Sequence, residues 1–180
     1  MKSGRNILLI SVVLMAMLSV SCGRSNALNG SKVESESASS STIPAGIPAP
    51  EFSVKTPSGE TRSLGDYSGK PLLVVFWATW CGNCMRELPS LSYMRNQISE
   101  DKLAMLAINL GENPATVASF LKKVPLPYEV GIDPRQKTAD QFGVEAIPMM
   151  VLINKSGNMV RINFGLDDRM VAMIKEMTGS

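Results

Sequence analysis

The sequence predicts an α/β protein in which helices cover both faces of a mixed central sheet. Residues 72–78 are continuously apolar and rich in β-forming side chains, which is typical of a strand buried on both faces. Segments with strand-like and helix-like spacing alternate after this run, and a hairpin and a helix end the chain. Two cysteines, Cys81 and Cys84, lie where the first buried strand gives way to a helix.

An entry hairpin is expected at the start of the domain. Phe52 and Val54 alternate with polar residues, as in a half-buried strand. Residues 57–59 (Pro-Ser-Gly) supply a turn, and residues 62–64 can return as the second arm. The buried strand 72–78 follows the hairpin.

The dithiol opens the next element, a helix predicted over residues 82–97. Its apolar residues recur at spacings of three and four and form one stripe that can face the sheet: Leu88, Leu91, Met94 and Ile98. Pro89 lies inside this helix and removes one backbone hydrogen bond, so we expect a kink there. Residues 103–110 predict the next buried strand.

The second half of the domain repeats the alternation of helices and strands. Asn113 as N-cap and Pro114 at the first helical position open a second helix. The remaining predicted elements are a strand at 128–132, a short helix at 136–142, two hairpin strands at 149–153 and 159–163, and a last helix at 167–177.

The composition excludes several function classes. The chain has 180 residues with 18 basic and 16 acidic side chains, and Lys2 and Arg5 at the extreme N-terminus account for the excess. A neutral domain without a basic cluster gives no reason to expect nucleic acid as a partner. We also expect the protein to be a monomer. The chain contains no histidine, which excludes a Ser-His-Asp triad, a Cys-His protease pair and a c-type haem attachment motif.

The N-terminus predicts an export signal over residues 1–21. Lys2 and Arg5 precede the apolar residues 7–20, a stretch that is short for a membrane span. Cys22 follows a segment that resembles a bacterial lipoprotein signal, although Leu18 lies one position further from the cysteine than is usual. We therefore expect Cys22 to be acylated; cleavage elsewhere and an uncleaved anchor are the alternatives.

A tether is expected between the anchor and the domain. Residues 22–43 are rich in serine and poor in large apolar side chains, so they cannot bury enough surface to offset the entropy of ordering. The Pro-rich residues 44–50 should be extended and mark the domain boundary. We predict a single domain over residues 44–180.

Cys81 and Cys84 are spaced one helical turn apart at a helix start, which favours dithiol chemistry. The helix N-terminus carries unpaired N–H groups and partial positive charge, so a cysteine there holds its thiolate form more easily than a free thiol. We predict Cys81 as the nucleophile. A zinc site is disfavoured because it needs two further ligands and the chain offers only Cys22. A structural disulfide remains an alternative, although so short a loop would stabilise the fold weakly.

Four motifs support a resemblance that covers about residues 50–177. They are FWATWCGNC at residues 76–84, Glu87 and Pro89 in the following helix, a strand-helix unit near residues 103–124, and Ile147-Pro148 before the hairpin strand. Together they resemble the thioredoxin superfamily, and in particular the TlpA/ResA-type anchored thiol:disulfide oxidoreductases of bacterial envelopes. The resemblance implies a thioredoxin-like three-layer fold with an N-terminal β-hairpin and that strand-helix unit as an insertion.

The resemblance also implies the composition of the site. It places a cis peptide bond at Pro148 against the two sulfurs, where the proline shapes a groove for the partner chain and keeps metal away from the dithiol. The residues expected to contact the partner are Trp80, Gly82, Asn83, Ile147, Pro148 and Met149. No cofactor is implied beyond the redox-active Cys81–Cys84 disulfide.

Glu87 is the carboxylate that the resemblance suggests as a relay for the proton of Cys84. A glutamate in the first turns of a helix is also favourable to the helix dipole, so both interpretations stay open. Thioredoxins themselves carry a buried aspartate where this chain has Val75, and a proline where it has Asn83. These departures leave Glu87 as the nearest replacement and leave the reduction potential unassigned.

The predicted function is a membrane-anchored thiol:disulfide oxidoreductase of the cell envelope that reduces disulfides of partner proteins. Cys81 attacks the partner disulfide, Cys84 resolves the mixed disulfide, and the resemblance implies an electron-donating membrane protein that recharges the pair. Cytochrome c precursors, disulfide isomerases and general oxidised proteins all fit as substrates.

Two other functions compete with this one. A peroxiredoxin-like thiol peroxidase shares the fold, but its Pro-x-x-x-Thr-x-x-Cys loop is replaced here by a strand before Cys81. A non-catalytic binding lipoprotein on the same scaffold would not need the cysteine pair.

Overall fold

The computed structural model describes residues 41–180. The predicted signal peptide, Cys22 and most of the predicted tether lie outside the described residues. The strands are β1 (Ser41–Pro48), β2 (Ser53–Lys55), β3 (Thr61–Ser63), β4 (Leu72–Trp77), β5 (Ala104–Leu110), β6 (Glu129–Asp133), β7 (Met149–Ile153) and β8 (Asn158–Asn163). The helices are η1, a 3-10 helix (Leu64–Tyr67), α1 (Gly82–Gln97), α2 (Pro114–Lys123), α3 (Lys137–Gln141) and α4 (Asp168–Thr178).

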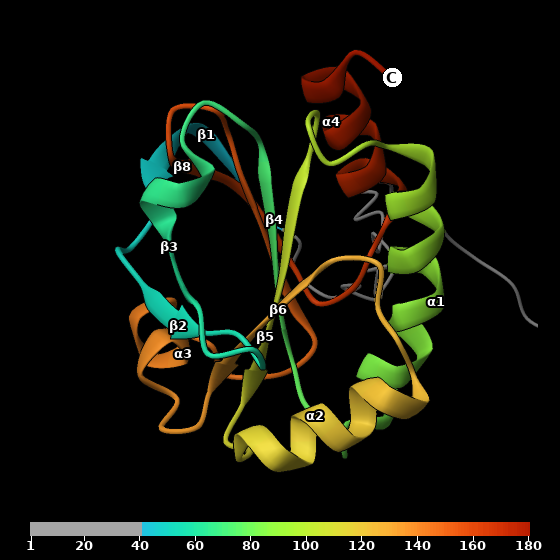
Figure 1. Cartoon of the computed structure of the whole chain (residues 1–180). Helices are drawn as coiled ribbons and strands as arrows, with labels where there is room; N and C mark the ends of the chain where they lie inside the picture. The colour runs from blue at the N-terminus through green and yellow to red at the C-terminus, as the bar shows by residue number, and fades with distance from the viewer. Residues whose placement is uncertain (1–40) are drawn as a thin grey trace, which may run out of the picture. The chain divides into compact units, whose positions relative to one another are not determined.

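The strands form one mixed sheet in the order β1-β8-β7-β4-β5-β6-β2-β3 (Figure 1). β4, β5 and β6 are parallel, with α1 and α2 as their crossover helices. β7 runs antiparallel to β4, and β2 runs antiparallel to β6. The predicted α/β class, the entry hairpin β2–β3 and the inserted unit β5–α2 are confirmed.

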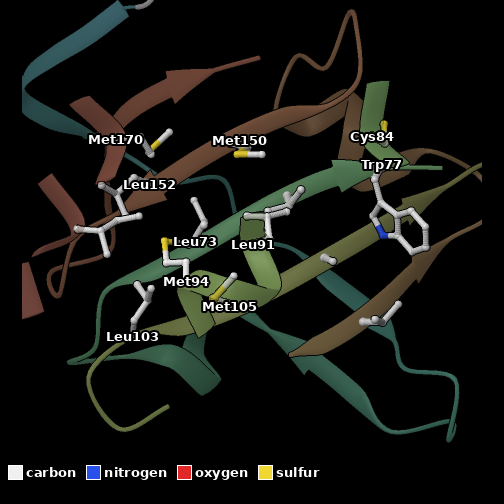
Figure 2. Close-up of a cluster of buried hydrophobic side chains, with 14 of the residues drawn as sticks. Leu73, Trp77, Cys84, Leu91, Met94, Leu103, Met105, Met150, Leu152 and Met170 are labelled. Carbon is white, nitrogen blue, oxygen red and sulfur yellow. The ribbon is translucent and has the colours of Figure 1, made fainter. Parts of the chain in front are cut away.

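Two hydrophobic clusters fill the two faces of the sheet. The first lies under α1, α2 and α4 and takes alternate side chains of β4, such as Leu73 and Trp77, with Leu91 from α1. Figure 2 shows Trp77 and Cys84 at one end of this cluster and Leu103 at the other. The second lies on the opposite face under η1 and α3 and takes the other side chains of β4. The dithiol therefore joins the core at the carboxyl end of β4.

The apolar stripe of α1 is confirmed, because Leu88, Leu91, Met94 and Ile98 are all buried. Both the N-cap of α2 and that of α4 are asparagine or aspartate, as helix starts prefer: Asn113 accepts a hydrogen bond from Thr116 N, and Asp167 accepts one from Met170 N.

Strand β1 is the main departure from the sequence prediction. It begins at Ser41, three residues before the expected domain boundary, and pairs antiparallel with β8 at the edge of the sheet. An edge strand tolerates prolines such as Pro44 and Pro48, because their missing N–H groups need not pair. The register shifts between Thr42 and Ile47, where Gly46 has φ of +74° and a Cβ would lie 2.6 Å from Asn158 Cβ. The Pro-rich stretch is extended as predicted, but within the sheet.

Candidate active site

The dithiol lies at the junction between β4 and α1. Cys81 N donates to Ala78 O at 3.2 Å, so residues 78–81 form a β-turn that leads from the strand into the helix. Cys81 is the N-cap of α1, and its sulfur accepts a hydrogen bond from Cys84 N at 3.1 Å. The two cysteines form a disulfide with a Cα–Cα distance of 5.2 Å. An N–H group at the helix start therefore points at Cys81 Sγ, as expected for a cysteine whose thiolate is stabilised.

The two sulfur-bearing residues differ in exposure. Cys81 is 6% exposed and Cys84 is 1% exposed, so a partner can reach the first more easily than the second. Val75 is buried in the same cluster as both cysteines, which places an apolar side chain where thioredoxins have a carboxylate. This strand position therefore offers the pair no proton-accepting side chain.

The residues around the dithiol form an exposed rim. Trp80 is 72% exposed, and Gly82 and Asn83 are also exposed at the start of α1. A Cβ added to Gly82 would meet nothing within 4 Å, so space is open above it. Arg86 Nη2 donates to Asn83 Oδ1 and fixes the amide on the helix surface. These three predicted partner-contacting residues are thus available to another protein.

The Ile147–Pro148 peptide bond is cis, as the resemblance implied. The carbonyl oxygen of Ile147 lies 3.7 Å from Cys81 Sγ, which places this segment against the sulfur. Pro148 is buried, and Met149 is 3% exposed and packs in the second core cluster. The side chain of Met149 therefore offers little surface to a partner.

A surface cavity of about 300 Å³ extends from this segment. Trp80 and Ile147 line it beside the dithiol. The rest of its wall comes from the last residue of β5 and from the loops after β5, β6 and α3: Leu110, Gly111, Gln136, Val144, Glu145 and Ala146. Gln136 has φ of +58°, uncommon for a residue with a side chain. Such strained positions gather at functional sites.

Glu87 bridges α1 to the segment before α4. Its Oε2 accepts a hydrogen bond from Leu166 N at 3.1 Å, and a Cβ on Gly165 would lie 3.2 Å from its Oε1. The described hydrogen bond of this carboxylate therefore goes to the backbone and not to a sulfur. A proton relay through Glu87 stays a prediction.

Glu112 is a site residue that the sequence analysis did not identify. Its carboxylate accepts hydrogen bonds from Thr79 N at 2.7 Å, Thr79 Oγ1 at 2.6 Å and Asn109 Nδ2 at 2.7 Å. Burial by itself would raise the pKa of Glu112, but these hydrogen bonds outweigh it and hold the pKa below its ordinary value. Glu112 is therefore ionised at neutral pH and is attached to the turn that precedes Cys81.

One signal in the sequence could have identified this carboxylate. Asn109 is the polar residue in the otherwise apolar β5 and is fully buried. Glu112 follows the carboxyl end of β5, and ligands and catalytic groups gather at the carboxyl ends of parallel strands. A polar side chain within an apolar strand, three residues before a carboxylate at the carboxyl end of that strand, predicts a hydrogen-bonded pair.

Within residues 41–180, no group of three or more His, Cys, Asp or Glu side chains is placed as a metal site requires. No helix in the described part of the chain is long and apolar enough to cross a bilayer.

Comparisons with known proteins agree with this geometry. A family model described as the AhpC/TSA family matches residues 45–162. The thiol-disulfide oxidoreductase ResA of Bacillus subtilis (strain 168) is 32% identical over 127 residues, which are 69% of this chain and 69% of that protein. ResA of Geobacillus thermodenitrificans is 31% identical over 123 residues, which are 68% of this chain and 71% of that protein.

Solved structures match the same region. The exposed lipoprotein thioredoxin Etrx1 of Streptococcus pneumoniae strain TIGR4 is 25% identical with a TM-score of 0.62, over 70% of this chain and 98% of that one. The thioredoxin domain of a thiol-disulfide oxidoreductase from Bacteroides vulgatus has a TM-score of 0.67 at 18% identity, over 77% of this chain and 98% of that one. The latter likeness shows the fold alone, which is thioredoxin-like.

Proposed function

Because the chain belongs to the AhpC/TSA family and is a thiol-disulfide oxidoreductase, we propose that it reduces disulfides of partner proteins outside the cytoplasm through Cys81 and Cys84. The observation that carries the proposal is the asymmetry of the pair. Cys81 is the more exposed of the two, caps the helix and lies beside the carbonyl of Ile147, a residue that lines the surface cavity, whereas Cys84 is only 1% exposed.

The reaction proceeds by two exchange steps. The Cys81 thiolate attacks one sulfur of the partner disulfide, so that a bond from Cys81 to the partner forms, the partner S–S bond breaks and one partner sulfur leaves as a thiolate. Cys84 then loses its proton and attacks Cys81 Sγ, which forms the Cys81–Cys84 bond and releases the second partner sulfur. Two electrons pass from the dithiol to the partner, whose two sulfurs each take up a proton.

Glu87 is included in the proposal as the acceptor of the Cys84 proton. It lies three residues after Cys84 on α1, a spacing that puts two side chains on the same face of a helix. A dithiol of an electron-donating membrane protein recharges the Cys81–Cys84 disulfide by the reverse exchange.

An anchored position in the envelope is part of the same proposal. The predicted export signal at residues 1–21 and the position of Cys22 support it, and a structural relative at 25% identity is a lipoprotein thioredoxin. An acyl chain on Cys22 would hold the domain near the bilayer by the tether of residues 22–43. Incorporation of a labelled fatty acid into the wild type and not into Cys22→Ala checks the anchor.

A trapping experiment tests the reaction. The Cys84→Ser variant, expressed in cells, lacks the resolving thiol, so we expect a mixed disulfide on Cys81 that dithiothreitol releases. The attached proteins are then identified by mass spectrometry, with cytochrome c precursors and disulfide isomerases as expected classes. The matched control is the Cys81→Ser/Cys84→Ser double variant, which should form no adduct.

Two combinations of results would contradict the proposal. If Cys84→Ser forms no adduct and the purified wild type consumes hydrogen peroxide with a thiol donor, the protein is a thiol peroxidase. If neither reaction occurs and Cys81→Ser retains the cellular function, the pair has no catalytic part.

A further inference from the structure

Glu112 connects the carboxyl end of β5 to the turn that carries Cys81. Both of its carboxylate oxygens accept from Thr79, one from the backbone N–H and the other from the hydroxyl, and Oε2 also accepts from Asn109. Hydrogen bonds to an ionised carboxylate are among the strong ones in proteins. Asn109 is fully buried, so it holds one side of the carboxylate in a fixed place.

Thr79 is the residue through which this attachment acts on the dithiol. In the β-turn of residues 78–81 it occupies the second position, two residues before Cys81. The turn sets where Cys81 lies as the N-cap of α1, and therefore how close its sulfur is to Cys84. Both cysteines pack in the same core cluster, but Cys84 lies inside α1 and is the more buried of the two. Release of Thr79 therefore acts on the Cys81 side of the pair.

We propose that Glu112 is a positioning residue that, through Thr79, holds Cys81 at the distance from Cys84 that favours the disulfide over the dithiol. The inference rests on the proposed redox role of the pair. It concerns an equilibrium between the two forms of the enzyme, which does not depend on which partner is reduced or on which sulfur attacks.

Two physical effects of removing the carboxylate act in the same direction. A looser turn lowers the effective concentration of one sulfur at the other, which disfavours the disulfide. Loss of a negative charge near the thiols favours the thiolate, which stabilises the reduced pair. In the variant Glu112→Gln an amide keeps one acceptor oxygen but puts an NH₂ group where donors already point, so hydrogen bonds are lost.

The test is the equilibrium of the full-length protein in detergent with reduced and oxidised glutathione. One Cys81–Cys84 disulfide and two glutathione thiols give the dithiol and one glutathione disulfide, and alkylation followed by mass measurement counts the two forms. We expect Glu112→Gln to shift this equilibrium about tenfold toward the dithiol, which is about 30 mV for two electrons.

A second variant separates positioning from charge. Thr79→Val removes the hydroxyl that donates to Glu112 Oε1 but leaves the carboxylate in place. We expect a shift of the same sign, about threefold, corresponding to about 15 mV. Thr79→Ser retains both donors and should behave as the wild type does.

Glu129→Gln is the matched control. Glu129 is also a half-buried carboxylate with two short hydrogen bonds, from Tyr67 Oη at 2.6 Å and Arg62 Nε at 2.7 Å. Neither donor belongs to the turn of residues 78–81. We expect it to lower stability and to leave the glutathione equilibrium unchanged within twofold. Thermal unfolding of each variant confirms that it is folded.

The possible results divide clearly. A shift in both Glu112→Gln and Thr79→Val supports the inference. An unshifted Glu112→Gln, or a shift in Glu112→Gln without one in Thr79→Val, overturns it, because in the second case charge alone acts. A wild-type pair that does not exchange with glutathione at all removes the proposed function and this inference with it.

Discussion

Glu112 and Glu129 lie at opposite ends of the three parallel strands: Glu112 at the carboxyl ends and Glu129 at the amino ends. Each accepts hydrogen bonds from a segment distant in the sequence. Glu129 begins β6 beside Leu106, whereas Glu112 follows the end of β5, where Leu110 pairs with Asp133. The donors to Glu112 lie in the turn before Cys81, and those to Glu129 lie in β3 and η1. Hydrogen bonding to a carboxylate therefore has different consequences at the two ends of the strands.

At the amino ends of the strands, where Glu129 lies, the hydrogen bonds connect structural elements. Arg62 of β3 and Tyr67 of η1 both donate to this carboxylate, so the entry hairpin and the 3-10 helix are attached to β6. Burial, and then the hydrogen bond to Glu129, raise the pKa of Tyr67, which stays a neutral donor. A change at this end of the strands is expected to alter stability without altering the chemistry of the pair.

The largest expected effect on stability comes from Gly131→Ala, in the strand that Glu129 begins. A Cβ at this position would lie 2.6 Å from Val54 Cγ2, so the hairpin must move away from β6. We expect a loss of about 2 kcal/mol in the free energy of unfolding, measured by denaturant titration.

The same substitution tests how independent the two ends of the strands are. Adding Val54→Ala removes the methyl group that collides, so the second change should cost less in the Gly131→Ala background than in the wild type. The glutathione equilibrium of Gly131→Ala should match the wild type. A shift of this equilibrium by more than twofold would show that the hairpin and the dithiol are coupled. The two ends of the strands would then not act independently.

A smaller effect is expected from Tyr67→Phe. The substitution removes the hydroxyl that donates to Glu129 at 2.6 Å and keeps the ring in the core. A hydrogen bond to a charged group contributes about 1.5 kcal/mol, and Arg62 remains as a partner of the carboxylate. Denaturant titration gives the loss, and Tyr93→Phe, at a tyrosine that is 69% exposed, is the control that should lose nothing. Equal losses in the two variants would contradict a specific role for the hydrogen bond.

Local patterns in the sequence predicted most of the fold. The apolar run of β4, the spacing of α1 and the cap of α2 are each determined by residues near one another in the chain, and all three are present. The position of Cys81 at the helix start follows from the same local order. Its exposure relative to Cys84 follows from the helical face that points into the core.

The features that the sequence did not predict depend on distant partners. Residues 41–43 belong to the predicted tether and residues 44–48 to the predicted Pro-rich boundary, and pairing with β8 makes both part of a strand. The attachment of Glu112 to Thr79 spans 33 positions, and that of Glu87 to Leu166 spans 79. Met149 lies in a strand that is apolar throughout and buried on both faces, so no alternation shows which face its side chain takes.

The smallest expected effect concerns pH and returns to Glu112. Its pKa is lowered in the folded protein, so in acid the unfolded state binds more protons than the folded state and stability rises with pH. The contribution of the ionised carboxylate is thus fully present above the unfolded pKa of about 4.3 and is lost as the pH falls through the lower folded value.

Glu112→Gln lacks this titration, which makes the pH dependence measurable as a difference between two proteins. The deficit of the variant in unfolding free energy should be constant between pH 6 and 7, on the order of 1 kcal/mol, and should shrink below about pH 4 as the wild type loses its charge. Tyr93→Phe should differ from the wild type at no pH in this range. A deficit of Glu112→Gln that is the same at pH 3 as at pH 7 would mean that the neutral carboxyl group holds Thr79 as well as the ionised one does, and that the charge of Glu112 is not what attaches the turn to β5.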